Sequence, residues 1–134
     1  MKCLVSGATG FIGRQLCQHL VARGDTVIAL SKNGAPLSSG EPSLALDLAV
    51  SDPDDELLRG VDVVFHLAGI AHRQERESAY EELNYLATVR LARLASAAGI
   101  RCFIFLSSVK AMGPPPSAAV RAENACILPT DAYG

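Results

Sequence analysis

The sequence has few aromatic residues, no long apolar run and no excess of either charge. It contains no tryptophan, and aromatic residues make up 5% of its 134 positions. Twelve basic against fourteen acidic residues give a formal net charge of −2, and no basic run could follow a phosphate backbone. Nucleic acid is therefore not an expected partner. No apolar run approaches the roughly 18 residues that a membrane-spanning helix needs, so no membrane is expected as a partner.

Secretion signals and metal-ligand spacings are also missing. Met1 and Lys2 lead directly into a strand-like run, without the apolar stretch of a signal peptide, so we expect a cytoplasmic protein. The four cysteines contain no C-x-x-C spacing, and no metal site is expected. Because Cys3 and Cys102 fall in runs that predict core strands, buried free thiols are expected rather than disulfides.

Apolar runs alternate along the chain with stretches of helical period. Runs rich in Val, Ile, Leu and Phe predict strands at residues 2–6, 26–30, 44–47, 61–67 and 102–107. Ile12, Leu16 and Leu20 predict a helix after the first strand. A second, longer helix is expected over about 76–98, with one apolar face made of Tyr80, Leu83, Ala87, Leu91, Leu94 and Ala98. Asp52, as an N-cap before Pro53, predicts a short helix over 52–58. The Gly- and Pro-rich residues 113–119 predict a mobile loop. Alternating strands and helices favour one α/β domain with a parallel sheet covered on both faces.

Three glycines follow the first predicted strand and open a helix. Gly7 would allow a tight turn, Gly10 would let a backbone approach a pyrophosphate, and Gly13 would let helix and strand pack closely. The N–H groups and positive dipole of the helix would then face the phosphates. The arrangement is typical of a Rossmann-type, doubly wound sheet that binds a dinucleotide.

Further motifs resemble the extended short-chain dehydrogenase/reductase family, which contains NAD-dependent epimerases and dehydratases. The turn Ser6-Gly7-Ala8-Thr9-Gly10-Phe11-Ile12-Gly13 resembles its Thr-Gly-x-x-Gly-x-x-Gly element, with serine where threonine is usual. The resemblance assigns cofactor contacts to Gly7, Thr9, Gly10, Phe11, Ile12, Gly13, Asp47, Leu48, Leu67, Ala68, Gly69 and Asn84. Asp47 and Leu48 would contact adenine, and Leu67 to Gly69 belong to an H-L-A-G turn beside the cofactor.

Two residues near the C-terminal end match the catalytic pair of this family. Ser108 is the second serine of Ser107-Ser108-Val109-Lys110-Ala111-Met112-Gly113, and Tyr133 stands in Pro129-Thr130-Asp131-Ala132-Tyr133-Gly134, which resembles the start of P-x-x-x-Y-[GA]-x-x-K. The resemblance implies that Tyr133, also beside the cofactor, exchanges a proton with substrate while Ser108 hydrogen-bonds the same substrate oxygen. The alternatives are a serine that caps the backbone after a strand and an aromatic residue of a loop.

The family lysine would come four residues after Tyr133, beyond Gly134. We therefore expect an incomplete Rossmann domain over residues 1–134, truncated after about five strands and lacking the C-terminal substrate-binding portion. Such a fragment would bind cofactor weakly and not turn over, although the parent would be an enzyme. By resemblance, the parent would form a homodimer through the long helix and the helix after Tyr133.

The choice between NADP and NAD depends on the end of the second predicted strand. An acidic residue about 20 positions past the glycine turn would bind the ribose 2′-OH of NAD, but Ser31 and Lys32 stand there. They would accommodate a 2′-phosphate, so NADP is the slightly favoured cofactor and NAD the alternative. Lys32 could equally be a solvated loop lysine.

The expected substrate is a nucleotide-sugar. Val109 and Lys110 replace the Asp-Glu pair of the 4,6-dehydratases in this family, which favours a 4-epimerase or 4-reductase of surface polysaccharide synthesis. A non-catalytic NAD(P)-binding sensor or scaffold, and a reductase of another alcohol or ketone, stay open as alternatives. His72 and Arg73 could contact substrate phosphate, gate the nicotinamide pocket or form a solvated helix entry.

Overall fold

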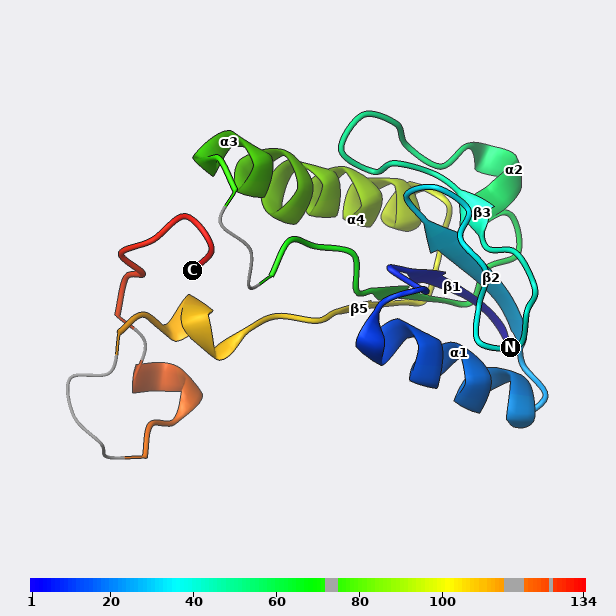
Figure 1. Ribbon diagram of the computed structural model, residues 1–134, viewed down its shortest axis with the longest axis horizontal. Coiled ribbons are helices and arrows are strands. Elements are labelled where there is room, and N and C mark those ends of the chain that lie inside the picture. The colour runs from blue at the N-terminus through cyan, green and yellow to red at the C-terminus, as the bar shows by residue number, and fades with distance from the viewer. Residues whose placement is uncertain (72–74, 115–119, 126) are drawn as a thin grey trace.

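The computed structural model describes residues 1–71, 75–114, 120–125 and 127–134. Within these ranges, parallel strands form one sheet in the order β3-β2-β1-β4-β5 (Figure 1). Their bounds are β1 Lys2–Ser6, β2 Thr26–Ser31, β3 Leu44–Ala45, β4 Val63–His66 and β5 Cys102–Phe105. The expected parallel α/β sheet is confirmed, with β3, β4 and β5 shorter than their apolar runs suggested.

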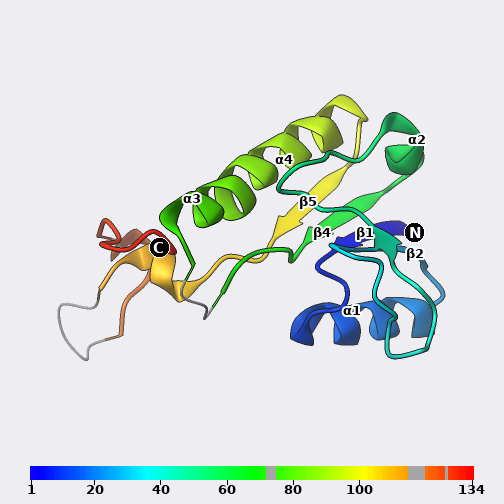
Figure 2. The same ribbon diagram turned by 45° about the horizontal axis from the view of Figure 1, so that its top comes forward.

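Helices cover both faces of the sheet (Figure 2). Alternate residues of β1 point to opposite faces. Cys3 and Val5 therefore pack with α1, which spans Phe11–Ala22, whereas Leu4 packs on the side of α4, which spans Ala87–Ala97. Leu4, Val5 and Cys3 are each 0% exposed, so the central strand is buried on both faces, as its unbroken apolar run predicts.

The buried face of α1 differs from the predicted one. Gly13, Cys17 and Leu20 are buried, whereas Ile12 is 49% exposed. The predicted stripe of Ile12, Leu16 and Leu20 was thus wrong at its first member. The helix begins at Phe11 directly after the glycine turn, and within its first turn it is Gly13 that packs against Gly7 and Ala8.

The long helix predicted over 76–98 is present but irregular. It runs through α3, Glu77–Tyr80, then the π-helical segment η1, Glu81–Leu86, and then α4. Ala87, Leu91 and Ala95 are its buried residues. The expected apolar face is therefore correct at Ala87 and Leu91 and half-buried at Leu94, whereas Ala98, the C-cap of α4, is exposed and Ala95 is buried without having been predicted. The π-helical turns were not predicted.

The short helix α2 begins later than predicted and has a different cap. It spans Asp55–Leu58, and the Asp54 carboxylate accepts the N–H of Leu57 at 2.8 Å. Asp52 is thus not the N-cap. Its carboxylate instead accepts a hydrogen bond from Arg90 of α4 at 2.9 Å.

Cys102 corrects the expectation of buried thiols. Cys3 and Cys17 are buried, but Cys102 is exposed, because β5 is the outer strand of the described sheet. Within the described ranges, no helix has the length and apolar character needed to cross a membrane. His72, Arg73 and most of the predicted 113–119 loop lie outside the described residues.

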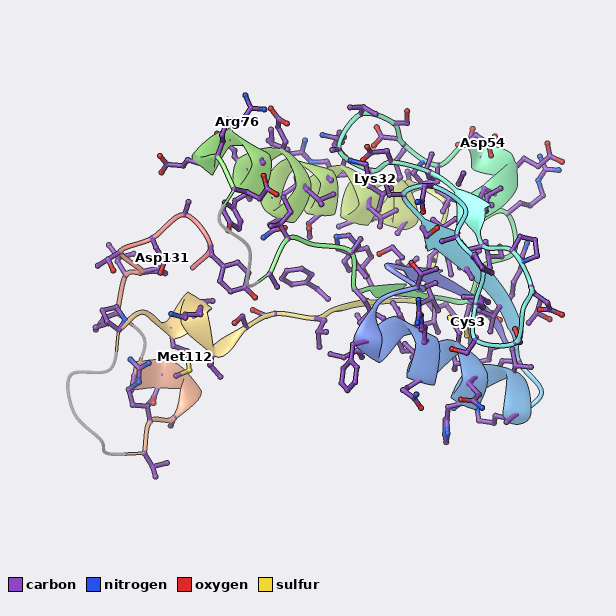
Figure 3. The ribbon with its side chains drawn as sticks, viewed as in Figure 1. Cys3, Lys32, Asp54, Arg76, Met112 and Asp131 are labelled. Atoms are coloured by element: carbon purple, nitrogen blue, oxygen red, sulfur yellow. The ribbon has the colours of Figure 1, made fainter. Side chains whose placement is uncertain are left out.

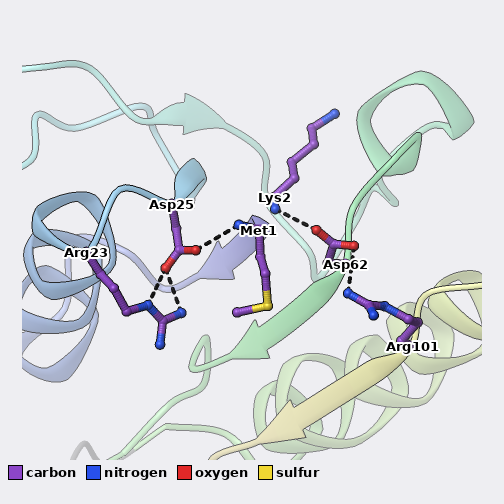
Figure 4. Close-up of polar contacts among 6 residues, drawn as sticks. All are labelled: Met1, Lys2, Arg23, Asp25, Asp62 and Arg101. Carbon is purple, nitrogen blue, oxygen red and sulfur yellow. Dashed lines mark hydrogen bonds and ion pairs between the residues drawn. The ribbon is translucent and has the colours of Figure 1, made fainter.

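Ion pairs hold the amino ends of the strands (Figure 4). The Met1 ammonium contacts Asp25 at 2.8 Å, and this contact raises the pKa of the amino group. Asp62 accepts the backbone N–H of Lys2 at 2.8 Å and pairs with Arg101 at 3.0 Å. This end of the sheet is therefore closed by structural contacts, which leaves the carboxyl ends of the strands for a site.

Candidate functional site

A cavity of about 870 Å³ lies beyond the carboxyl ends of β1, β4 and β5. Its walls come from the start of α1, from residues 67–71 and 105–108, from α3 and η1, and from the C-terminal residues 132–134. Figure 1 shows that the C-terminal segment lies near α3, although the two are far apart in sequence. The cavity brings together most of the predicted site residues.

The glycine turn has the geometry that its spacing predicts. Gly7 has a φ of +68°, and a Cβ there would lie 2.8 Å from the Ala68 nitrogen and the Leu67 carbonyl carbon. A Cβ on Gly13 would overlap the carbonyl oxygen of Gly7. These contacts confirm the tight turn at Gly7 and the close helix packing at Gly13.

The beginning of α1 is open toward the cavity. Its N-cap, Gly10, provides no side-chain hydrogen bond to the first backbone N–H groups. A Cβ on Gly10 would meet one heavy atom within 4 Å, the Gly7 oxygen at 3.2 Å, and otherwise fill open space. Gly10, Phe11 and Ile12 line the cavity, with Phe11 92% exposed. Uncapped N–H groups above a glycine fit a pyrophosphate, with Thr9 within the same turn.

Ser6 and His66 join the ends of β1 and β4. They are register partners in the sheet and both are 0% exposed. The Ser6 hydroxyl lies 2.6 Å from His66 Nδ1 and accepts the backbone N–H groups of Leu67 and Ala68, each at 3.2 Å. Leu67, Ala68 and the following Gly69 form the cavity floor.

Asn84 of η1 holds the next part of that floor. Its side-chain oxygen accepts the Ile70 N–H at 2.7 Å, and its amide donates to the Ile70 carbonyl at 2.9 Å. A Cβ on Gly69 would lie 3.1 Å from the same Asn84 oxygen. Asn84 also lines the cavity. Its contacts therefore hold Ile70 and lie close against Gly69, and its predicted contact with the cofactor stays a prediction.

Ser108 and Tyr133 line the same cavity. The Ser108 hydroxyl accepts the backbone N–H of Lys110 at 3.2 Å and so caps the turn Val109–Met112. A hydroxyl that accepts one hydrogen bond still has its proton to donate. The Tyr133 ring lies 6.0 Å from that of Tyr80, centroid to centroid. The structure thus brings the predicted catalytic pair to one cavity, and their catalytic roles stay predictions.

The four residues predicted for the adenosine end lie outside this cavity, around the loops after β2 and β3 (Figure 3 labels Lys32). The ammonium of Lys32 pairs with Asp47 at 3.0 Å, and this contact lowers the pKa of Asp47. Ser31 is 5% exposed, and its hydroxyl is hydrogen-bonded to that of Ser43 at 2.6 Å. The Leu48 side chain is 4% exposed in the core. Lys32 and Asp47 are therefore the more accessible members of this group.

Several cavity residues were not among the predicted site residues. Tyr80 and Tyr85 come from the long helix, and Phe105 and Leu106 come from the end of β5. Glu77 and Glu81 add the only charged side chains among the described lining residues. Helical spacing identified Tyr80 as part of an apolar face. That spacing could not show that Tyr80 lines the cavity, because this depends on how the helix lies on the sheet.

The sequence profile of the NAD dependent epimerase/dehydratase family matches residues 3–134. The chain belongs to this family. The chain is 32% identical to the UDP-glucose 4-epimerase of Mycolicibacterium smegmatis, over 99% of this chain and 47% of that relative. It is 34% identical to the 2-alkyl-3-oxoalkanoate reductase of Stenotrophomonas maltophilia, over 81% of this chain and 33% of the relative.

Solved structures agree with the Rossmann-type fold of this family member. MoeE5 in complex with UDP-glucose and NAD superposes with a TM-score of 0.86 at 30% identity, over 100% of this chain and 44% of MoeE5. The UDP-glucuronic acid 4-epimerase from Bacillus cereus in complex with NAD gives 0.83 at 28% identity, over 100% and 48%. The chain thus spans between a third and a half of the length of these relatives.

Proposed function

We propose that this chain is the cofactor-binding part of an NAD(P)-dependent enzyme that epimerises or reduces a nucleotide-sugar at C4. One observation carries the proposal: an uncapped helix start, Ser108 and Tyr133 share one cavity. UDP-glucose and NAD are named in the complex of the similar MoeE5. A role in surface polysaccharide synthesis, a cytoplasmic location and a homodimeric parent stay predictions.

The residues present fit a dinucleotide and suggest their own tasks in the reaction. The glycine turn would hold the pyrophosphate, and Leu67 to Gly69 would support the nicotinamide end. The bound cofactor would accept a hydride from the substrate and return it. Tyr133 would exchange a proton with a substrate hydroxyl through its phenolic oxygen. Ser108, which retains a donatable proton, would hydrogen-bond the same substrate oxygen.

The cofactor could be NAD or NADP. Lys32 is exposed enough to meet a 2′-phosphate, which favours NADP, but its ammonium is already paired with Asp47, and the Ser31 hydroxyl is used by Ser43. The similar solved structures named above contain NAD. We therefore propose NAD as the first cofactor to test. A dissociation constant for NADPH at least tenfold below that for NADH would contradict this choice.

A second candidate is a reductase of another ketone. The similarity to a 2-alkyl-3-oxoalkanoate reductase favours it, because that relative is as close in sequence as the epimerase. Both candidates need Ser108 and Tyr133, so substrate preference separates them. A non-catalytic sensor would need neither residue.

The test uses the full-length protein, screened with UDP-sugars and with aliphatic β-ketoacids. We expect Tyr133→Phe to lower kcat by about 100-fold or more and Ser108→Ala by about tenfold or more, with NADH binding retained. Ser96→Ala, an exposed serine of α4, is the matched control and should leave kcat unchanged. Wild-type rates in both variants would contradict the catalytic assignment, and binding without any turnover would favour the sensor. The 134-residue chain alone is expected to bind cofactor without turnover.

A further inference from the structure

A closed set of hydrogen bonds links β1, the floor of the cavity and the long helix. Ser6 bonds to His66, as described above, and the opposite ring nitrogen, Nε2, lies 2.8 Å from the Thr88 hydroxyl of α4. Thr88 donates to the backbone carbonyl of Asn84 at 2.8 Å. Asn84 then holds Ile70 through two hydrogen bonds. The set begins at the N–H groups of residues 67 and 68 and returns to residue 70.

The contacts determine where each proton lies. The Ser6 oxygen already accepts two backbone N–H groups, so its own proton is free to be donated to His66 Nδ1. At the other end, the single hydroxyl proton of Thr88 goes to the Asn84 carbonyl, so Thr88 accepts from Nε2–H. Only the neutral His66 tautomer with its proton on Nε2 satisfies both partners.

The surroundings of His66 favour that neutral form. The ring is 0% exposed, and two rings of the neighbouring strand β5 lie near it, Phe105 at a centroid distance of 5.8 Å and Phe103 at 5.9 Å. Its described partners on β1, β5 and α4 are hydroxyls and aromatic rings, none of them charged. Burial lowers the pKa of His66 to about 4.

We propose that His66 is a positioning residue: its neutral Nε2–H tautomer couples the helix at Thr88 to Ser6 and thereby fixes the cofactor-facing backbone of residues 67–69. The proposal rests on the proposed cofactor site, because those residues line the cavity. His66 itself does not line it, so it acts through Ser6 rather than on a reacting group. Since the neutral form persists well below neutral pH, His66 does not switch the site between pH 5 and 8.

The first test observes the histidine directly. Selective ¹⁵N-histidine labelling of the full-length protein, with His66→Asn to assign the signals by difference, reports the protonation of each ring nitrogen. We expect a protonated Nε2 and an unprotonated Nδ1 from pH 8 to pH 5. An Nδ1–H tautomer, or an imidazolium at pH 6, would overturn the proposal. This measurement does not depend on cofactor binding, so it is informative even if the proposed function fails.

The second test asks whether Ser6 and Thr88 act together, although no hydrogen bond joins them. We expect Ser6→Ala and Thr88→Val each to weaken NADH binding by about tenfold, and the double variant to bind no more weakly than the poorer single one. Thr88→Ser, which keeps the hydroxyl, should bind like the wild type. Effects that multiply in the double variant would refute coupling through His66.

A control separates positioning from loss of stability. Leu91→Ala removes a buried side chain of α4 that belongs to the core, and it is expected to lower the unfolding midpoint without changing the NADH dissociation constant of the folded protein. Weaker binding in Leu91→Ala equal to that in Thr88→Val would show a structural role alone. No NADH or NADPH binding by the wild type would overturn the proposed function, and with it the positioning role.

Discussion

Substitution of Gly7 by alanine should destabilise the protein and disrupt the cavity floor together. A left-handed residue with a Cβ costs about 1–2 kcal/mol. The new Cβ would also lie 2.8–2.9 Å from backbone atoms of Leu67 and Ala68, which cannot rotate away as a flexible side chain would. Relieving such an overlap typically costs about 1–3 kcal/mol. The expected loss in free energy of unfolding is therefore about 2–5 kcal/mol.

Gly24 offers a matched control because it shares the backbone conformation without the crowding. Its φ is +87°, and a Cβ there would meet nothing within 4 Å. Gly24→Ala should lower the free energy of unfolding only by the cost of the left-handed backbone, about 1–2 kcal/mol. Urea unfolding of both variants thus isolates the steric cost. Titration with NADH should show binding weakened by tenfold or more in Gly7→Ala and unchanged in Gly24→Ala. Equal losses of stability in the two variants would refute the steric reasoning.

Three further predictions concern charge. If Lys32 meets a 2′-phosphate, Lys32→Met should raise the NADPH dissociation constant about tenfold and leave that for NADH unchanged, as measured by fluorescence titration. The pKa of His66 is 6.5 in the unfolded state and about 4 in the folded state, so between these pH values the unfolded state binds a proton that the folded state does not. The free energy of unfolding should therefore drop by about 3 kcal/mol from pH 6.5 to pH 4. The drop should be smaller in His66→Asn. Arg90→Met should lower the free energy of unfolding, measured in urea, by about 1–2 kcal/mol, because Arg90 donates to the Leu48 carbonyl at 2.7 Å. The same substitution at the exposed Arg93 should change that free energy little.

The sequence was most informative where local rules act alone. The apolar run before Gly7 predicts a buried strand, and the glycine spacing predicts a turn whose crowding the structure confirms at Gly7 and Gly13. Both patterns are read from residues within about ten positions of one another, and the contacts at Gly13 are equally local, whereas the crowding at Gly7 comes from Leu67 and Ala68 after a distant strand. The catalytic assignments of Ser108 and Tyr133 came instead from resemblance, and the structure brings both to the cavity without testing their roles.

Features that depend on distant contacts were missed. The π-helical segment carries Asn84, whose side chain holds Ile70, a residue 14 positions earlier in the chain. The helical spacing of apolar residues gives no information about such a contact. Asp54 rather than Asp52 caps α2, and Asp52 instead pairs with Arg90 from a helix much later in the chain. Cys102 lies in an apolar run that suggests burial, and only the strand order places it on the outer strand.

Strand order also explains why the cavity lies where it does. The chain runs outward from β1 to β2 and β3, then returns to place β4 on the other side of β1, so the crossing helices leave the sheet in opposite directions at this point. In open parallel sheets, ligands bind outside the carboxyl ends of the strands at such a reversal. Ser6, His66 and Phe105 end their strands in one continuous register. Residues beyond each of them therefore arrive at the same edge, and a change at any one of the three strand ends must move part of the cavity wall.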